Sequence, residues 1–449
     1  MKPIYYLLIK SKNLKYLYLA VTCFTGVFCF AQQDSISTVR NITLDEVLNL
    51  GAKNNRQLKI ANTDVAIAQE NVSQAKVAKV PRIGLNAGYN YIGDPKLYEG
   101  FYKNSIPVDY YNHQGYATIA SGIPIYAGNI INKSIEQQEL ISEIQTSVAK
   151  MTEADIKIAI IKQYYTLEKL YRQIEITKQN IINTDLRISQ LKSRVANGQN
   201  LKSDLLRTEL QQSRFKVSVL QDTNDIALVS NYLDILIGLP TDLILKPELD
   251  EIVLPLVEVD LKKSIAEARE NRMEIKQGEI DVKISETSLD ITRSGFKPAV
   301  NANLMLNTEY PAQWPNYVNI VNFWAIGLSL NWDISSFYNL KHRTKADKFQ
   351  IDKRNIALDE TKDQIEREVK AAFIKVEESK ENITTYKKDV ELALSNYKIV
   401  KSRYDNDFAL ISDMVDAELQ LNGAKISLVN ANLDLIIQYY SLQYAMGTL

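Results

Sequence analysis

The sequence predicts a mixed α/β membrane protein in which very long helices alternate with short strands. Three features lead to this class: a long helical run, several alternating segments of about ten residues, and an internal repeat. The run from 129 to 195 contains neither proline nor glycine, and a helix of that length reaches ~100 Å. Its second half has an apolar residue every seven positions, which favours a left-handed supercoil with other long helices: Leu167, Ile174, Ile181, Ile188 and Val195.

The N-terminus has the pattern of an export signal peptide, which we place at 1–31. Lysines at positions 2, 10, 12 and 15 precede an apolar run at 16–30, and Cys29, Phe30 and Ala31 fit the small-x-small cleavage rule. The alternative is an uncleaved membrane anchor, for which about 15 apolar residues are short. Because cleavage after Ala31 removes both cysteines, we expect no disulfide or cysteine-bound metal in the mature chain. A lipid anchor is not expected either, because neither Cys23 nor Cys29 follows the small residue that a lipid-attachment site requires.

The composition narrows the possible partners. The chain has 53 Lys and Arg against 54 Asp and Glu, and no basic block follows Ala31, so nucleic acid is not an expected partner. No stretch after Ala31 reaches the roughly 18 apolar residues of a membrane-crossing helix. The 25 Tyr and the modest 24% of charged residues leave room for transmembrane strands, each of which has a weak sequence signal.

The chain repeats itself. A shift of 217 positions places 44–90 on 261–307, with Pro81 on Pro298, and a shift of 209 places 194–210 on 403–419. We therefore predict an internal duplication, with repeat 1 at 32–240, an inter-repeat linker at 241–260 and repeat 2 at 261–449.

Each repeat is expected to contain a helix, two strands, a very long helix and a last helix. Pro81 and Pro298 end the first helices, because proline does not continue a helix. The clearest strand alternates large apolar residues with small or polar ones up to Trp332, which is typical of a strand with two different faces. Repeat 1 is predicted to have a helix at 43–79, strands at 82–92 and 115–126, a long helix at 129–195 and a helix at 200–237. Repeat 2 is predicted to have a helix at 261–295, strands at 299–308 and 322–334, a long helix at 339–405 and a helix at 409–446.

Four strands of about ten residues are long enough to cross an outer membrane at a tilt. They are too few to close a barrel, and open sheet edges do not occur in lipid. Three chains would supply twelve strands, so the sequence predicts a homotrimer with a 12-stranded β-barrel (four strands per chain) continuous with a long α-helical coiled-coil barrel. The alternative is an ordinary sheet attached to a structural stalk.

Three segments carry a resemblance to a known family. They are 122–128 (GIPIYAG) at a strand-to-helix junction, 403–418 around the connection between the last two predicted helices, and 445–449 (AMGTL). With the repeated order of elements, they make the chain resemble the TolC-type outer membrane efflux proteins (outer membrane factors) over essentially all of the mature sequence.

The resemblance implies a location in the bacterial outer membrane, with a helical tunnel in the periplasm. It implies an exit duct of a tripartite efflux or type I secretion system that conducts substrate passively. The expected partners are a periplasmic adaptor (membrane fusion) protein, an inner-membrane pump of the RND or ABC type and outer membrane lipid. The alternative function is an exported trimeric coiled-coil adhesin or structural stalk.

The resemblance also assigns candidate residues at the periplasmic entrance. Asp413 and Asp416 match aspartates that constrict the entrance in the family. Their i, i+3 spacing puts both on one helix face, and rings of acids favour cations in pores. The alternative is a structural one, because Asp is favourable at any helix N-terminus.

The family closes its entrance with bonds between an aspartate, a tyrosine and an arginine. Asp204 and Tyr404 match the first two, whereas Ala409 occupies the arginine position. Arg207 or Arg403 is near enough in sequence to take its place, and simple packing between helices is the alternative role for Tyr404.

Aromatic residues in the strands are candidates for girdles at the lipid boundary, with packing on a neighbouring strand as the alternative: Trp324, Trp332, Tyr89, Tyr91 and Tyr116.

An enzyme is not expected. His113 and His342 are the only histidines, and the chain has no G-x-S-x-G, P-loop or HExxH motif. We predict no catalytic residue, no cofactor and no metal site.

Overall fold

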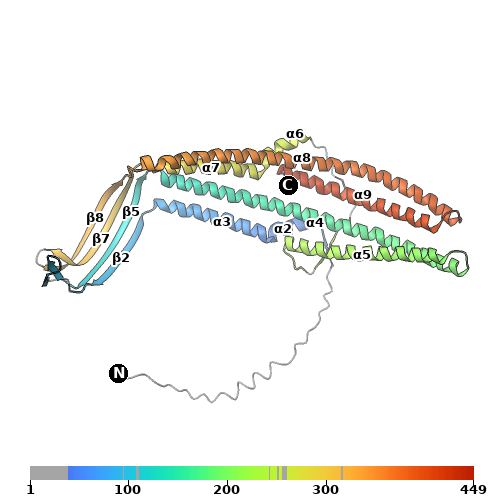
Figure 1. Ribbon diagram of the computed structural model, residues 1–449, viewed down its shortest axis with the longest axis horizontal. Coiled ribbons are helices and arrows are strands. Elements are labelled where there is room, and N and C mark those ends of the chain that lie inside the picture. Colours follow the sequence, from blue (N-terminus) through green and yellow to red (C-terminus); the bar gives the residue numbers. More distant parts are fainter. Residues whose placement is uncertain are drawn as a thin grey trace, which may run out of the picture. The chain divides into compact units, whose positions relative to one another are not determined.

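The computed structural model describes residues 39–94, 96–107, 111–241, 243–249, 252–254, 260–314 and 317–449. The predicted signal peptide at 1–31 and part of the predicted linker lie outside these residues. Within the described part, the order of helix, strands, long helix and last helix occurs twice (Figure 1).

The described residues of the first half form the α-helices α2 (Leu44–Asn54), α3 (Arg56–Lys76), α4 (Ile130–Ala196) and α5 (Lys202–Ile237). A short 3-10 turn, η1 (Val77–Lys79), follows α3. The predicted single helix at 43–79 is therefore wrong, because the chain breaks at Asn55. The side-chain oxygen of Asn55 accepts hydrogen bonds from the amides of Gln57 and Leu58, which caps α3.

The second half contains α6 (Leu261–Asn271), α7 (Met273–Ser294), α8 (Ser336–Asp405) and α9 (Ile411–Met446). The helix predicted at 261–295 is again divided, here at Arg272. At ~1.5 Å per residue, the 70 residues of α8 extend over roughly 105 Å. None of the helices in the described part of the chain has both the length and the apolar character required to span a membrane.

The two breaks are equivalent joints. Asn55 donates from Nδ2 to the carbonyl of Leu236 (2.8 Å), and Arg272 donates from Nη1 to the carbonyl of Ala445 (3.1 Å). Both acceptors lie at the end of the last helix of their half. That helix ends in each case at a glycine with positive φ, 70° in Gly238 and 72° in Gly447.

The main sheet has four antiparallel strands in the order β2–β5–β7–β8. They are β2 (Arg82–Tyr91), β5 (His113–Ala127), β7 (Ala299–Trp314) and β8 (Tyr317–Asn331), and β2 and β8 form the two edges. Three of these strands begin or end beyond their predicted bounds: β5 starts at His113, β7 continues to Trp314 and β8 starts at Tyr317.

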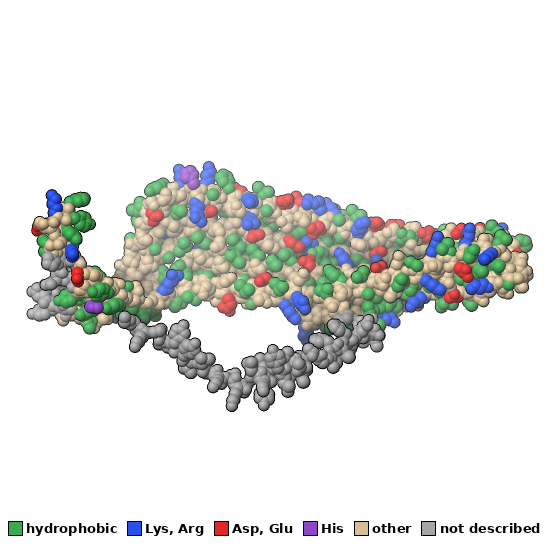
Figure 2. All heavy atoms as spheres, turned by 60° about the horizontal axis from the view of Figure 1, so that its bottom comes forward, with side chains coloured by type: hydrophobic (Ala, Val, Ile, Leu, Met, Phe, Trp, Pro, Cys, Tyr) green, Lys and Arg blue, Asp and Glu red, His purple; other side chains and the backbone are tan. Residues whose placement is uncertain are grey.

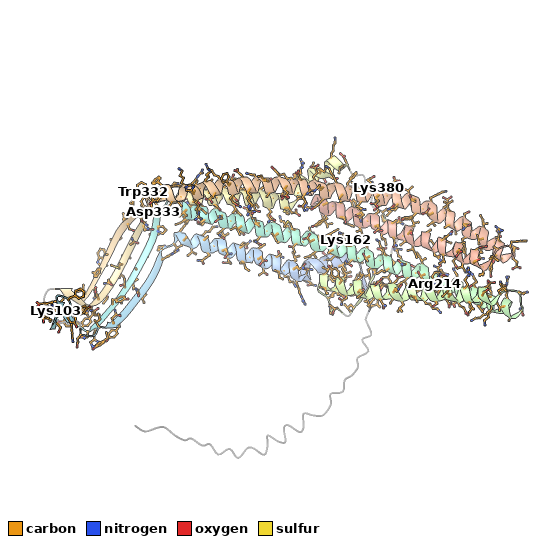
Figure 3. All side chains as sticks on the ribbon, in the orientation of Figure 1. Lys103, Lys162, Arg214, Trp332, Asp333 and Lys380 are labelled. Carbon is orange, nitrogen blue, oxygen red and sulfur yellow. The ribbon has the colours of Figure 1, made fainter. Side chains whose placement is uncertain are left out.

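Two small sheets were not predicted. Strand β1 (Val39–Ile42) pairs in parallel with β6 (Ile244–Pro247), so the start of the described chain lies beside a segment that the sequence assigned to the linker. Strands β3 (Lys96–Glu99) and β4 (Asn104–Pro107) form a hairpin in the connection between β2 and β5. The hairpin includes Lys103 in its turn, beyond the end of the main sheet that is remote from the helices (Figure 3).

The helices form one layer in two stretches. In the stretch next to the sheet, α3 contacts α4, α4 contacts α7 and α7 contacts α8. In the stretch away from the sheet, α5 contacts α4, α4 contacts α9 and α9 contacts α8. Thus α3 and α5 lie at one edge of the layer and α8 lies at the other, as Figure 1 shows.

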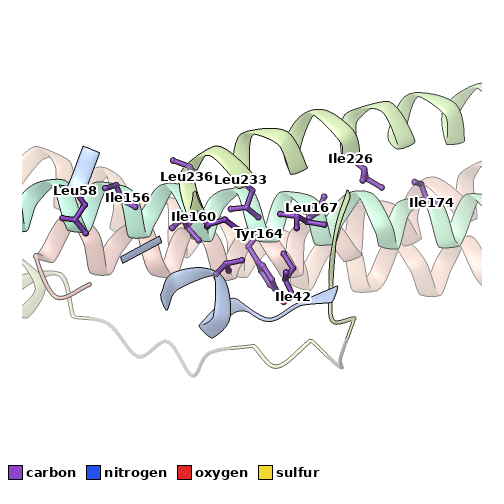
Figure 4. Packing of buried hydrophobic residues seen from close by; sticks show 13 residues of the cluster. Ile42, Leu58, Ile156, Ile160, Tyr164, Leu167, Ile174, Ile226, Leu233 and Leu236 are labelled. Carbon is purple, nitrogen blue, oxygen red and sulfur yellow. The ribbon is translucent and has the colours of Figure 1, made fainter. Parts of the chain in front are cut away.

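Buried apolar residues form separate cores in the two halves. The first core joins α2, α4, α5, β1 and β6, and Leu167, Leu233 and Leu245 are fully buried in it (Figure 4). The second core joins α6, α7, α8 and α9 around Val369, Val376 and Leu442. A third cluster, which we call the tip cluster, contains residues of both halves: Leu191, Leu205, Tyr397, Val400, Tyr404, Ile411, Met414 and Val415.

Candidate functional site

The main sheet has one apolar face and one face of small and polar residues. Paired residues of antiparallel strands point to the same face, so the register defines each row across the sheet. One row consists of Leu85, Ile119, Leu306 and Trp324, and the next of Ile83, Ser121, Leu304 and Ile326. Further along β8 the same face continues through Leu328 and Leu330, both about 70% exposed. This face offers a continuous apolar surface that the chain itself does not cover.

The opposite face, which we call the polar face, consists mainly of small and polar residues. One row contains Asn86, Thr118, Asn307 and Phe323, the next Gly84, Ala120, Met305 and Ala325, and the third Arg82, Gly122, Asn303 and Gly327. The Thr118 hydroxyl donates to Asn307 Oδ1, and Asn303 Nδ2 donates to Ser329 Oγ at 3.0 Å. A sheet with these two faces fits between lipid on one side and water on the other.

Aromatic side chains gather at the end of the sheet remote from the helices. Tyr89 and Tyr91 lie on the apolar face of β2, and the Tyr89 hydroxyl is hydrogen-bonded to His113 Nδ1. The Tyr91 ring meets the His113 ring edge-on with centroids 5.1 Å apart. Tyr116, in contrast, lies on the polar face, in the row of Gly88 and Glu309. Its predicted place at the lipid boundary is therefore not supported.

A second aromatic group lies where the sheet meets the helices. Trp332 follows the last residue of β8, and its Nε1 donates to the carbonyl of Phe296 at 3.1 Å (Figure 3). The Phe337 ring is 6.2 Å from Trp332 and 5.7 Å from Phe296. Trp324 belongs to neither group, because it pairs with Leu306 in the middle of the sheet.

The separation of the two aromatic groups matches the height of a lipid-facing band. The row of Tyr116 reaches Val321 on β8 through Glu309. Tyr89 pairs with Gly115, so its row lies one residue further from the helices than that of Tyr116. From the Tyr89 row to Trp332 the strand advances by about 12 residues, or ~40 Å at ~3.3 Å per residue. At a tilt of about 45° this is ~28 Å along the membrane normal, close to the ~25 Å apolar band of outer-membrane barrels.

At the end remote from the sheet, the long helices are connected to the last helices by two tight turns. One joins α4 to α5 at Asn197 and Gly198, and the other joins α8 to α9 at Asn406 and Asp407. Gly198 and Asp407 both have positive φ, 72° and 64°. The tip cluster packs directly behind these turns and includes residues from α4, α5, α8 and α9.

Asp413 and Asp416 lie exposed in the first turns of α9, beside the buried residues Met414 and Val415. The Asp413 carboxylate accepts a hydrogen bond from the Leu410 amide at 3.2 Å, so it caps its own helix. The two carboxylates share one exposed side of the helix and are free to face a pore. For Asp413, however, the capping role alone is enough to explain an aspartate at this position.

Tyr404 lies within electrostatic range of Asp204 at the tip. Tyr404 packs in the tip cluster, and this burial raises the pKa of its hydroxyl. The charges of Arg194 and Arg187 lower that pKa, whereas the Asp204 carboxylate raises it, which places all three groups within electrostatic range. Asp204 itself accepts a hydrogen bond from Asn200 at 3.5 Å.

The arginines that join the two halves at the tip are not those that the sequence suggested. Arg403 donates to the carbonyl of Phe408 within its own turn (3.5 Å). Instead, Arg194 pairs with Asp407 (3.2 Å) and Arg187 pairs with Glu418 (2.6 Å). The second pair is buried, with side-chain exposures of 10% and 5%.

Sequence reasoning missed these two pairs because each joins residues more than 200 positions apart. The available signal was the position of Arg187 one residue before the heptad residue Ile188, close to the helical seam. In the part of the chain that the structure describes, no group of three His, Cys, Asp or Glu is arranged to hold a metal ion. Figure 2 shows charges of both signs spread over the helices instead of one basic patch.

Comparison with known proteins finds a match to one sequence family in the second half of the chain. Residues 264–448 match the sequence family described as "Outer membrane efflux protein". Over 423 residues the chain is 20% identical to the outer membrane protein TolC of Salmonella enteritidis, a similarity that covers 90% of this chain and 82% of TolC.

Solved structures of outer-membrane channels share the fold. The channel OprN has a TM-score of 0.76 at 16% identity, and the similarity covers 90% of each chain. The outer membrane protein VceC of Vibrio cholerae has a TM-score of 0.74 at 16% identity, covering 90% of this chain and 96% of VceC. The Campylobacter jejuni CmeC outer membrane channel has a TM-score of 0.73 at 13% identity, covering 90% and 85%. The mixed α/β fold predicted from the sequence is thereby confirmed.

Proposed function

We propose that the chain, whose residues 264–448 match the outer membrane efflux protein family, is an exit channel in the bacterial outer membrane. One observation carries this function. A sheet with an apolar and a polar face is continuous in sequence with α4 and α8, the two longest helices. A wall that faces lipid outside and water inside thus continues into a wall of helices.

A single chain cannot enclose a pore. The sheet ends at β2 and β8, whose outer edges have no partner strand in the described part of the chain, and such edges do not occur in lipid. Three chains supply twelve strands, and pairing of β8 with β2 of the next copy closes a barrel. The helices then form a tunnel in the periplasm, and an ancestral duplication accounts for the repeated order of elements.

The two aromatic groups mark the boundaries of the lipid-facing band in this arrangement. Tyr89 and Tyr91 belong to the outer girdle and Trp332 belongs to the periplasmic girdle. We leave out Tyr116, which lies on the polar face, and Trp324, which lies between the girdles.

The helix tips form the periplasmic entrance of the proposed channel. Three copies of Asp413 and Asp416 surround it and favour cations, and Tyr404 with Asp204 contributes to its closure. A periplasmic adaptor protein and an inner-membrane pump of the RND or ABC type, in a tripartite efflux or type I secretion system, open the entrance and supply the energy. The channel conducts substrate passively and performs no chemistry.

Reconstitution of the purified full-length chain tests the proposal. A closed barrel keeps its compact form in SDS until it is boiled, and it produces discrete conductance steps in a planar lipid bilayer. A protein that runs identically with and without boiling and never conducts would instead be an exported stalk or adhesin, the alternative that its long helices allow.

A further inference from the structure

The free edges of the sheet and of the helical layer coincide. Helix α3 leads through η1 into β2, and β8 leads into α8. Helices α3 and α5 therefore lie on the β2 side of the chain and α8 lies on the β8 side. Figure 3 shows this separation, with Arg214 on α5, Lys380 on α8 and Lys162 of α4 between them.

The edge formed by α3 and α5 carries a stripe of exposed apolar residues: Ile60, Ile67, Leu210, Val217 and Ile235, each at least half exposed. Ile67 lies nine residues from the buried Leu58. Val217 and Ile235 each lie nine residues from the buried Ile226. Nine residues are two and a half helical turns at ~3.6 residues per turn, so the stripe points directly away from the chain's own core.

Helix α8 carries a second stripe, on the other edge: Phe349, Ile356, Ile374, Leu392 and Ile399, all more than half exposed. The buried core residues of this helix include Ile365 and Ile383. Ile356 and Ile374 lie nine residues to either side of Ile365, and Leu392 lies nine residues after Ile383. This stripe also points away from the core.

The spacings of the two stripes mirror each other. Along α5, Leu210, Val217 and Ile235 are separated by 7 and 18 residues. Along α8, read in the opposite direction, Ile399, Leu392 and Ile374 are separated by the same 7 and 18 residues. Near the sheet, Ile60 and Ile67 are separated by 7 residues, as are Ile356 and Phe349.

The mirrored spacings match only if the helices of the two edges run in opposite directions where they meet, and they do. α5 starts at the tip turn and runs from it, whereas α8 runs toward its own tip turn, so the two helices are antiparallel when their tips are level. α3 runs toward the sheet and α8 runs away from it, so this pair is antiparallel too. Four other exposed apolar or aromatic residues of α5 meet charged side chains of α8 in this register and are not part of the match: Leu206, Leu220, Leu228 and Tyr232.

We propose that these two stripes form the seam between copies of this chain, with a register that the apolar residues define. Leu210, Val217 and Ile235 of one copy pack against Ile399, Leu392 and Ile374 of the next copy. Ile60 and Ile67 pack against Ile356 and Phe349. The partner is thus a second copy of this chain. The closed ring of copies in which this seam lies rests on the proposed function. The residue pairs of the seam are inferred from the exposure and the spacing of the two stripes.

Cysteine cross-linking tests the register. A chain with Val217→Cys and Leu392→Cys brings the two sulfurs of neighbouring copies within disulfide distance, where Cβ atoms are ~4 Å apart. The control chain, with Val217→Cys and Ile399→Cys, has the same chemistry shifted by one heptad, about 10 Å along the helix. Because α5 and α8 lie on opposite edges of one chain, a cross-link joins two copies.

After mild oxidation and boiling in SDS, the first chain is expected to give a reducible ladder up to the trimer, with at least tenfold more cross-linked product than the control. The oxidised wild-type chain shows any contribution of Cys23 and Cys29. The pair Ile60→Cys and Ile356→Cys repeats the test near the sheet. A ladder from the control but not from the matched pair overturns the register.

The two proposals fail separately. No ladder from either matched pair, in a protein that still forms heat-modifiable conducting channels, overturns the seam and leaves the exit channel intact. A protein that is monomeric in the membrane overturns both.

Discussion

Replacing Arg187 with methionine tests how firmly the two halves are joined at the helix tips. Arg187 Nη1 lies 2.6 Å from Glu418 Oε2, and both side chains are almost completely buried. Glu418 Oε1 is also buried and accepts no hydrogen bond in the described structure. The variant keeps the bulk of the side chain but leaves the Glu418 carboxylate without its cation.

Removing one partner of a buried ion pair costs about 3–5 kcal/mol. At about 1.4 kcal/mol for each factor of ten, local opening becomes roughly 10²- to 4 × 10³-fold more frequent. Hydrogen exchange of the amides at 184–191 and 414–422, followed by mass spectrometry, measures that opening directly. The double variant Arg187→Met with Glu418→Met should return to within about tenfold of the wild type, because apolar replacement of a buried pair is close to neutral.

Lys169→Met is the matched control. Lys169 joins the same two helices through Asp434, but the Asp434 side chain is 46% exposed. An ion pair of this kind contributes ~0.2–1 kcal/mol, so exchange should rise less than about sixfold. If Arg187→Met changes exchange no more than this control, the buried pair does not hold the tip together and our reasoning fails.

The remaining predictions concern the entrance, a joint and a buried acid. Asp413→Asn with Asp416→Asn should lower cation selectivity in planar bilayers, and unchanged reversal potentials would remove both residues from the pore. Gly238→Ala should destabilise the chain by ~1–3 kcal/mol in thermal melts, because Gly238 has a positive φ and an added Cβ would lie 2.7 Å from the Cβ of Asn54. Gly198 has a similar φ but open space around it, so Gly198→Asn should cost less than about 1 kcal/mol. Burial, and then the charge of a nearby acid, raises the pKa of Asp222, so its ionised form destabilises the fold above that pKa. Asp222→Asn should therefore raise the melting temperature at pH 7, with a gain that shrinks as the pH falls toward 4.

The sequence predicted the long helices and the strands because their signals are local and repeat many times. The helix predicted at 129–195 runs from Ile130 to Ala196, and the one predicted at 339–405 runs from Ser336 to Asp405. Period-two alternation likewise located all four strands of the main sheet, and the register places their large residues on one face.

The features that sequence reasoning missed depend on contacts between distant residues. Nothing local near Arg272 ends a helix, since its role at the joint depends on the carbonyl of Ala445. Strand β1 is only four residues long and exists through its pairing with β6 about 200 positions later. The pairing of Arg187 with Glu418 required the antiparallel register of α4 and α9, which no repeat in the sequence encodes.

The distribution of buried apolar residues indicates where the helical layer is able to move. Each half has its own apolar core, and between the halves α4 meets α9 through polar and aromatic contacts such as Asp155 with Tyr444 and Lys169 with Asp434. Polar contacts at a half-exposed seam exchange with water at little cost. The tip is different, since the tip cluster and the buried ion pair of Arg187 join both halves there. Away from the sheet, where β5 and β7 join the halves directly, a partner that separates the helices of the two halves must therefore act on the buried contacts of the tip.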